Sequence, residues 1–138
     1  MAQIPLPAWY EADSSSLEPA FLHELRAFLD SAFDGEFSDE DWQHSLGGIH
    51  VWRTLPTGEL VSHGSLVVRR LRVGPHDLQV GYLEAIATAP AARGRGHGSA
   101  VLGRLGELVR ERFPLGVLST GSHAFYERQG WERWQGRT

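Results

Sequence analysis

Ala91-Ala92-Arg93-Gly94-Arg95-Gly96-His97-Gly98-Ser99-Ala100 joins a segment with the pattern of a β-strand to a segment with the pattern of an amphipathic helix. Glycines at such a junction let the backbone approach an anion closely, and the unpaired N–H groups at the helix start point towards it. The stretch therefore predicts a pyrophosphate-binding loop. Taken alone it is explained equally well as a flexible basic surface loop, and it contains neither G-x-G-x-x-G nor G-x-x-x-x-G-K-[ST].

Both flanks of this loop carry periodic apolar residues. The segment before it predicts three antiparallel strands at 49–54, 60–72 and 77–88, which form a meander with turns at 56–58 and 74–75. After it, a helix that ends at Phe113-Pro114 is predicted by one apolar face: Val101, Leu102, Leu105, Leu108 and Val109. A strand at 115–119, a short helix at 122–129 closed by Gly130, and a final strand at 131–134 complete the expected order.

In the N-terminal third of the chain, the sequence pattern strongly predicts two helices and no other element. Residues 1–16 read as a loose segment that can include a short strand. Apolar residues spaced by three and four from Leu17 to Ala32 predict an amphipathic helix that ends at Gly35. Ser38, with Asp41 three residues later, forms a capping-box pattern for a second, shorter helix.

Composition and length place limits on the kind of protein. A chain of 138 residues predicts a single domain, 1–138, with one hydrophobic core. There is no apolar run near the roughly 20 residues that cross a bilayer, and the net charge of -4 argues against a general nucleic-acid binder. The chain has no cysteine and no signal-peptide pattern, so a cytoplasmic location is expected. The histidines lack the spacing of a metal site, and no metal is predicted.

Two motifs in the right order resemble those of the GNAT N-acetyltransferases. Residues 93–98 resemble the Arg/Gln-x-x-Gly-x-Gly/Ala motif of that family, and Phe125-Tyr126-Glu127-Arg128-Gln129-Gly130-Trp131 resembles its second conserved segment. The resemblance implies an α/β (α+β) fold, in which a mixed, mostly antiparallel central sheet is flanked by helices. It also implies acetyl-CoA as the cofactor and direct attack of an amine on its thioester.

The same resemblance assigns expected roles to residues of this chain. The backbone of Ile86 and Thr88 would pair with the pantetheine arm, and Arg93 and Arg95 would add positive charge. Tyr126 matches the acid that protonates the departing thiolate, although an ordinary buried tyrosine beside Phe125 is an alternative. The amides that would hold the pyrophosphate belong to Gly94, Arg95, Gly96, His97, Gly98 and Ser99.

Acidic residues indicate where a cationic acceptor would bind. Five acids gather within residues 34–41, a pattern that is more often a solvated helix start than a binding site. Glu84 differs from them because it lies in an otherwise apolar strand, two residues before the expected cofactor contact at Ile86. The two-residue period of a strand would aim its side chain consistently to one side.

A narrower resemblance concerns the acceptor. Residues 32–48, Gly81-Tyr82-Leu83-Glu84 and Leu118-Ser119 are similar to the aminoglycoside 2′-N-acetyltransferases. In that family the positions of Glu36, Asp41, Glu84 and Ser119 contact the drug, and the acid at Glu84 accepts the amine proton through water. The resemblance therefore implies acetylation of the 2′-amino group. The rival functions are acetylation of a protein N-terminus, a lysine or a polyamine, and cofactor binding without catalysis.

The chain departs from that narrower family at three places. Glu36 stands where an aspartate is usual, and the segment from Ser119 to Tyr126 is about two residues shorter. The family also continues for several tens of residues past the position of Thr138, so the C-terminal strand is expected to be missing here. A homodimer, in which a second subunit completes the acceptor site, is one expectation that follows.

Overall fold

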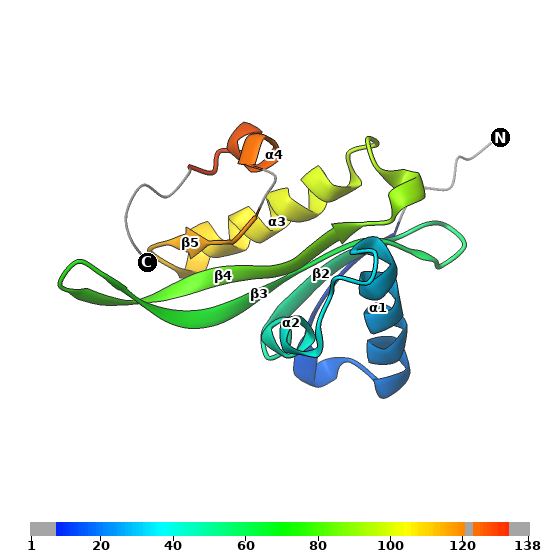
Figure 1. Ribbon diagram of the computed structural model, residues 1–138, viewed down its shortest axis with the longest axis horizontal. Helices are drawn as coiled ribbons and strands as arrows, with labels where there is room; N and C mark the ends of the chain where they lie inside the picture. The colour runs from blue at the N-terminus through cyan, green and yellow to red at the C-terminus, as the bar shows by residue number, and fades with distance from the viewer. Residues whose placement is uncertain (1–7, 121–122, 133–138) are drawn as a thin grey trace.

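The computed structural model of this chain describes residues 8–120 and 123–132. Its centre is a five-stranded sheet with the spatial order β1-β2-β3-β4-β5 (Figure 1). The first four strands pair antiparallel in sequence order, which confirms the predicted meander, and β5 pairs parallel with β4. The strands are β1 (Ala8–Asp13), β2 (Ile49–Thr54), β3 (Leu60–Val73), β4 (His76–Thr88) and β5 (Gly116–Val117).

Helices cover both faces of the sheet, as Figure 1 shows. On one face lie α1 (Pro19–Ala32) and α2 (Asp39–His44), and on the other lie α3 (His97–Arg112) and α4 (His123–Arg128). Two 3-10 turns, η1 (Ser14–Ser16) and η2 (Pro90–Ala92), complete the elements. No helix among the described residues is long and apolar enough to cross a membrane.

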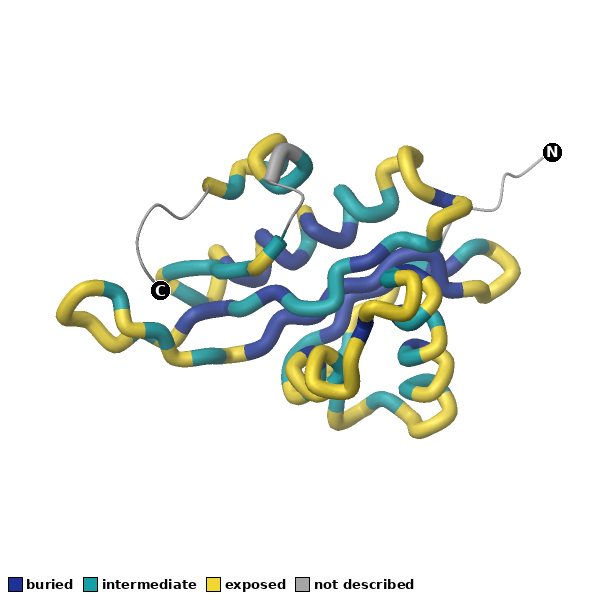
Figure 2. The backbone as a smooth tube through the Cα atoms, in the orientation of Figure 1, coloured by how far each residue is buried: buried dark blue, intermediate teal, exposed yellow. Residues whose placement is uncertain are grey.

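Each face of the sheet has its own apolar cluster, and Figure 2 shows many buried residues in the strands between them and on α3. The apolar face predicted for α3 is buried as expected, and Val101, Leu102 and Leu105 are at most 1% exposed. These residues pack against Val51, Leu66 and Leu83. On the opposite face Leu25 and Leu29 of α1 pack with Trp52, Leu60 and Ala87. The single core expected from the chain length is thus divided by the sheet.

A β-bulge interrupts β4 at the centre of the molecule. Ser65 of β3 pairs with Glu84, but His63 pairs with Ala87, so that Ala85 and Ile86 together oppose Gly64. Ala85 has a φ of +50°, which is uncommon for a residue with a side chain. Ile86 packs on the α3 side and Ala85 on the α1 side. The prediction that side chains alternate regularly between the two faces of this strand is therefore wrong beyond Glu84, because the bulge inserts an extra residue.

The ends of the chain differ more from prediction than its middle. The N-terminal segment contains β1, an edge strand paired with β2 throughout its length. β5 is shorter than the predicted strand at 115–119, and Gly130 has the positive φ expected of the residue after a helix. The predicted final strand at 131–134 lies partly outside the described residues, and Trp131 and Glu132 are not in a strand.

Candidate active site

One cleft of about 1210 Å³ lies between the glycine loop, the second half of β4, α4 and the segment before α2. Its lining brings together every residue of the predicted site except Arg95, whose side chain is exposed outside the cleft. The predicted residues in the lining are Glu36, Asp41, Glu84, Ile86, Thr88, Arg93, Gly94, Gly96, His97, Gly98, Ser99, Ser119 and Tyr126.

The glycine loop has the geometry of an anion cradle. Gly94 and Gly96 have φ values of +81° and +84°, and a Cβ atom added to either residue would meet nothing within 4 Å. Gly96 is the N-cap of α3, so the first N–H groups of that helix have no partners within the helix. At Gly98 an added Cβ would lie 2.9 Å from Thr88 Oγ1. The backbone of the loop is thus open, and the helix start approaches the end of β4 closely, which fits a bound pyrophosphate.

Arg93 makes contacts that the sequence did not suggest. Its Nη2 donates to the carbonyl of Ala32 at 2.9 Å, and its Nε donates to the carbonyl of Thr88 at 3.4 Å. The guanidinium therefore links the glycine loop to the C-terminal end of α1 and to the end of β4. Its predicted contribution of charge to the phosphate site is additional to this structural role and stays a prediction.

Glu84 is a half-buried acid paired with an arginine on the neighbouring strand. Arg69 Nη2 donates to Glu84 Oε1 at 3.2 Å and to the carbonyl of His44 at 3.1 Å. The Arg69 guanidinium also lies over the ring of Tyr82, 5.3 Å from its centre. Burial raises the pKa of Glu84 above its ordinary value, and Arg69 opposes that rise. A carboxylate with a raised pKa in a cleft is suited to accept a proton near neutral pH.

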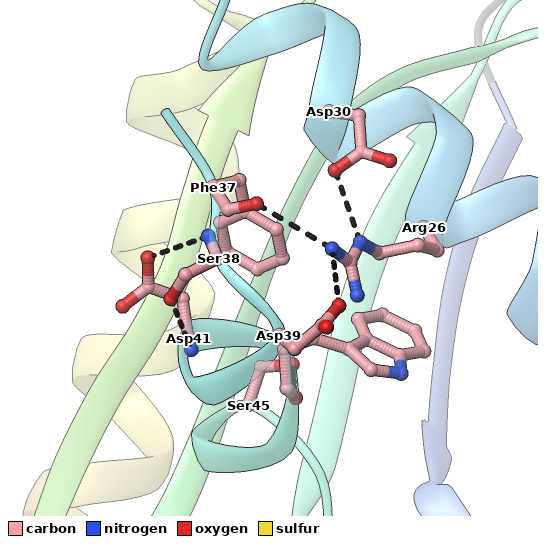
Figure 3. A network of polar contacts seen from close by, with 8 residues as sticks. Arg26, Asp30, Phe37, Ser38, Asp39, Asp41 and Ser45 are labelled. Atoms are coloured by element: carbon pink, nitrogen blue, oxygen red, sulfur yellow. Dashed lines mark hydrogen bonds and ion pairs between the residues drawn. The ribbon is translucent and has the colours of Figure 1, made fainter. Parts of the chain in front are cut away.

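Asp39 and Asp41 lie in the first turn of α2 and belong to a network of polar contacts (Figure 3). Arg26 of α1 donates to Asp39 Oδ1 at 3.0 Å and to the carbonyl of Phe37. Asp41 accepts a hydrogen bond from the Ser38 amide at 3.0 Å, and the Ser38 hydroxyl accepts one from the Asp41 amide. The predicted capping box is therefore confirmed. Arg26 holds this segment against α1, and Asp41 also lines the cleft.

Tyr126 lies on α4, which is on the other face of the sheet from α1 and α2. Its ring meets that of Phe125 edge to face, with 5.0 Å between ring centres. Burial raises the pKa of Tyr126, and a hydrogen bond with Thr120 opposes that rise. The side-chain amide of Gln129 donates to Ser99 Oγ at 3.2 Å and so connects α4 to the start of α3. Tyr126 packs against the core on the α3 side and also lines the cleft, so the two interpretations of this residue are compatible.

The family model described as an Acetyltransferase (GNAT) domain matches residues 14–134 of this chain. The chain belongs to the GNAT acetyltransferase family. This GNAT chain is 37% identical over 127 residues to an aminoglycoside 2′-N-acetyltransferase of Mycolicibacterium fortuitum. The match covers 91% of the GNAT chain and 65% of the relative, so the chain spans about two thirds of that protein's length.

Solved structures share the GNAT fold at low sequence identity. The aminoglycoside N-acetyltransferase AAC(6′)-Iy, determined in complex with CoA, matches with a TM-score of 0.72 and 14% identity, over 100% of this chain and 95% of that one. An acetyltransferase of Trypanosoma brucei matches with a TM-score of 0.67 and 20% identity, over 96% of each chain. These likenesses support the α/β GNAT fold that the two sequence motifs implied.

Sequence reasoning missed four residues of β3 that contact the site strand of this GNAT domain. Arg69 pairs with Glu84, and Ser62, His63 and Ser65 bind backbone carbonyls of β4. The sequence feature that could have indicated them is the polar run at 62–65, which is preceded and followed by apolar residues of the same strand. His63 is fully buried, as is His50 of the neighbouring strand β2.

Proposed function

We propose that this protein transfers the acetyl group of acetyl-CoA to the 2′-amino group of an aminoglycoside. The observation that carries the proposal is a single cleft that combines an anion cradle with carboxylates. The cradle, at Gly94 and Gly96, suits a pyrophosphate, and the carboxylates of Glu36, Asp41 and Glu84 suit a substrate with several ammonium groups. The 37% identity to a curated aminoglycoside 2′-N-acetyltransferase supports the same acceptor.

The residues of the cleft fit acetyl-CoA. GNAT acetyltransferases use this cofactor, and the backbone amides from Gly94 to Ser99 would hold its pyrophosphate at the start of α3. The backbone of Ile86 and Thr88, at the end of β4 beside the bulge, would pair with the pantetheine arm. When bound, acetyl-CoA supplies a thioester that an uncharged amine can attack directly.

Glu84 and Tyr126 would handle the protons. An aminoglycoside amine is protonated near neutral pH, so Glu84 would accept its proton through water before the attack. Tyr126, whose pKa is raised by burial, stays protonated at neutral pH and would give its proton to the departing thiolate. Glu36, Asp41 and Ser119 would hold the other polar groups of the drug. A homodimer and a cytoplasmic location stay predictions of the sequence.

The test is acetyl-CoA-dependent release of free thiol with a panel of aminoglycosides that carry either an amine or a hydroxyl at the 2′ position. Spermidine and short peptides serve as alternative amines. We expect turnover only with the 2′-amino drugs. Turnover with spermidine or peptides but with no aminoglycoside would show that the acceptor is another amine. Binding of acetyl-CoA without turnover on any amine would favour a non-catalytic cofactor-binding domain.

Replacing Arg69 by glutamine is expected to move the acid limb of the kcat/KM profile to higher pH. The limb reports protonation of the free enzyme's base, and Arg69 lowers the pKa of Glu84. Without the guanidinium the pKa of Glu84 rises further, so at any pH on the acid side of the profile a larger fraction of Glu84 is protonated and inactive. The measurement is kcat/KM against pH with one 2′-amino drug.

Two matched variants make this measurement specific. Arg69→Lys keeps the positive charge and is expected to keep the acid limb near its wild-type position. Arg70→Gln removes an exposed arginine from the next position of β3 and is expected to leave the profile unchanged. If the acid limb of Arg69→Gln stays at its wild-type position, Glu84 is not the group that accepts the proton of the amine.

A further inference from the structure

A polar run, Ser62-His63-Gly64-Ser65, lies in β3 directly opposite the bulge of β4. Ser62, His63 and Ser65 each have 0% of their surface exposed. Buried polar side chains are expected to be hydrogen-bonded, and a bulge leaves groups of the strand ladder without their regular partners. The position of the run suggests that its side chains bind the irregular part of β4.

All three side chains bind backbone carbonyls of the bulged segment. The hydroxyl of Ser65 donates to the carbonyl of Glu84 at 3.2 Å, and the hydroxyl of Ser62 donates to the carbonyl of Ala87 at 3.2 Å. Between them, His63 Nδ1 lies 2.9 Å from the carbonyl oxygen of Ala85, the residue with positive φ. Side chains of β3 thus replace backbone partners along the bulge, and His63 binds its most unusual residue.

The contact at Ala85 fixes the protonation of a longer chain of hydrogen bonds. A carbonyl oxygen only accepts, so His63 carries a proton on Nδ1, and in the neutral ring its Nε2 accepts. His50 Nδ1 lies 2.9 Å from that Nε2 and is therefore the donor. His50 Nε2 then accepts from the hydroxyl of Ser14, which itself accepts from the Gly47 amide at 3.0 Å. All the hydrogen bonds run in one direction, from the turn before β2 to the bulge.

This arrangement requires both imidazoles to be neutral. Burial, together with repulsion from His50, lowers the pKa of His63 to about 3, and the hydrogen bond to the carbonyl of Ala85 opposes this change. Burial lowers the pKa of His50 to about 4, opposed by Asp13 of β1. Both rings are therefore neutral near pH 7, where each can donate through one nitrogen and accept through the other.

We propose that His63, held by His50, is a positioning residue for the acetyl transfer. It fixes the carbonyl of Ala85 and so maintains the bulge that directs Glu84 and Ile86 to opposite faces of β4. An alanine with positive φ is strained and persists only where its surroundings hold it. If the bulge relaxed, a one-residue slip would move the side chains of β4 to the other face. The inference rests on the proposed function, because it concerns the same cleft.

The first test compares two substitutions of His63. Asn places an amide N–H2 at nearly the position of Nδ1, so His63→Asn keeps the donor to Ala85, whereas His63→Leu removes it and keeps most of the volume. We expect His63→Leu to lower kcat by about 10- to 100-fold, the size expected of a small misplacement of reacting groups. His63→Asn is expected to recover most of kcat, and His76→Leu, at an exposed histidine of β4, is the control.

These assays are run well below the unfolding midpoint of each variant. A role in stability alone would lower the midpoint of both His63 variants and leave kcat of His63→Leu at the wild-type value, which would overturn the inference. A wild type that releases no thiol with any amine would overturn the proposed function, and the assigned role of His63 with it.

The second test does not depend on catalysis. Long-range ¹H–¹⁵N spectra of the imidazole rings at pH 7 are expected to show His50 and His63 both protonated on Nδ1. A proton on Nε2 of His63 would overturn the proposed contact with Ala85. The spectra report on the contact with Ala85 even if the wild type shows no turnover, because only the first test needs an acceptor, so a failure of this contact can be told from a failure of the proposed function.

Discussion

Glu84→Gln is expected to lower kcat/KM for the aminoglycoside by about 100- to 10,000-fold, the usual contribution of a general base. The amide keeps the size of the side chain but cannot accept a proton from the substrate amine. Glu84 lines the cleft but is not part of the glycine loop, and the proposal assigns it to the acceptor, so the dissociation constant of acetyl-CoA should stay near its wild-type value. Steady-state thiol release and acetyl-CoA titration by calorimetry measure the two quantities separately.

The variant also removes the partner of Arg69, so its folding has to be measured with its activity. The pair is partly exposed, and its loss is expected to cost only about 1 kcal/mol. Glu59→Gln, an exposed acid in the turn between β2 and β3, is the matched control and should retain full turnover. Equal losses in acetyl-CoA affinity and in turnover would contradict the assignment of Glu84 to the acceptor side.

Gly96→Asp is expected to weaken acetyl-CoA binding by about 100-fold or more. The new carboxylate would enter the open space of the cradle, where an added Cβ meets no atom within 4 Å. Two unit charges about 5 Å apart near a protein surface repel by about 3 kcal/mol, which corresponds to roughly 100-fold in affinity. The backbone strain of a side chain at positive φ adds roughly 1 kcal/mol and acts on folding as well as on binding.

Two further variants separate charge from strain. Gly96→Asn has the same shape and a similar tolerance of positive φ, so its loss of affinity should be much smaller than that of Gly96→Asp. Gly58→Asp introduces comparable strain at a φ of +91°, in a turn outside the cleft, and should leave acetyl-CoA binding unchanged. If Gly96→Asp bound acetyl-CoA as tightly as the wild type, the glycine loop would not be the phosphate site.

The elements with strong local signals could be predicted from the sequence. The meander and α3 follow from apolar periodicity, and the start of α2 follows from the capping box of Ser38 and Asp41. These features depend on residues that are close in the chain. The grouping of the predicted site residues in one cleft followed from the resemblance to a family, since nothing local brings residues 36–41 to β4.

The bulge of β4 and its contacts could not be predicted in the same way. Ala85 carries no signal of a positive φ, because alanine rarely adopts one, and its carbonyl is bound by a side chain of another strand. Arg69 lies fifteen residues from Glu84, and its partner depends on the register of the hairpin. The polar residues at 62–65 did carry a signal, since a buried polar run implies partners, but it does not identify them.

The division of the packing into two clusters, one on each side of the sheet, has a consequence for divergence. Substitutions among α1, α2 and the segment between them fall in the cluster that includes Leu25 and Trp52, whereas the helix behind the glycine loop packs in the other. Energetic effects at separate sites without shared partners tend to add independently. Under the proposed function, changes in the segment between α1 and α2 could therefore alter the choice of acceptor while leaving the packing of the helix behind the glycine loop almost intact.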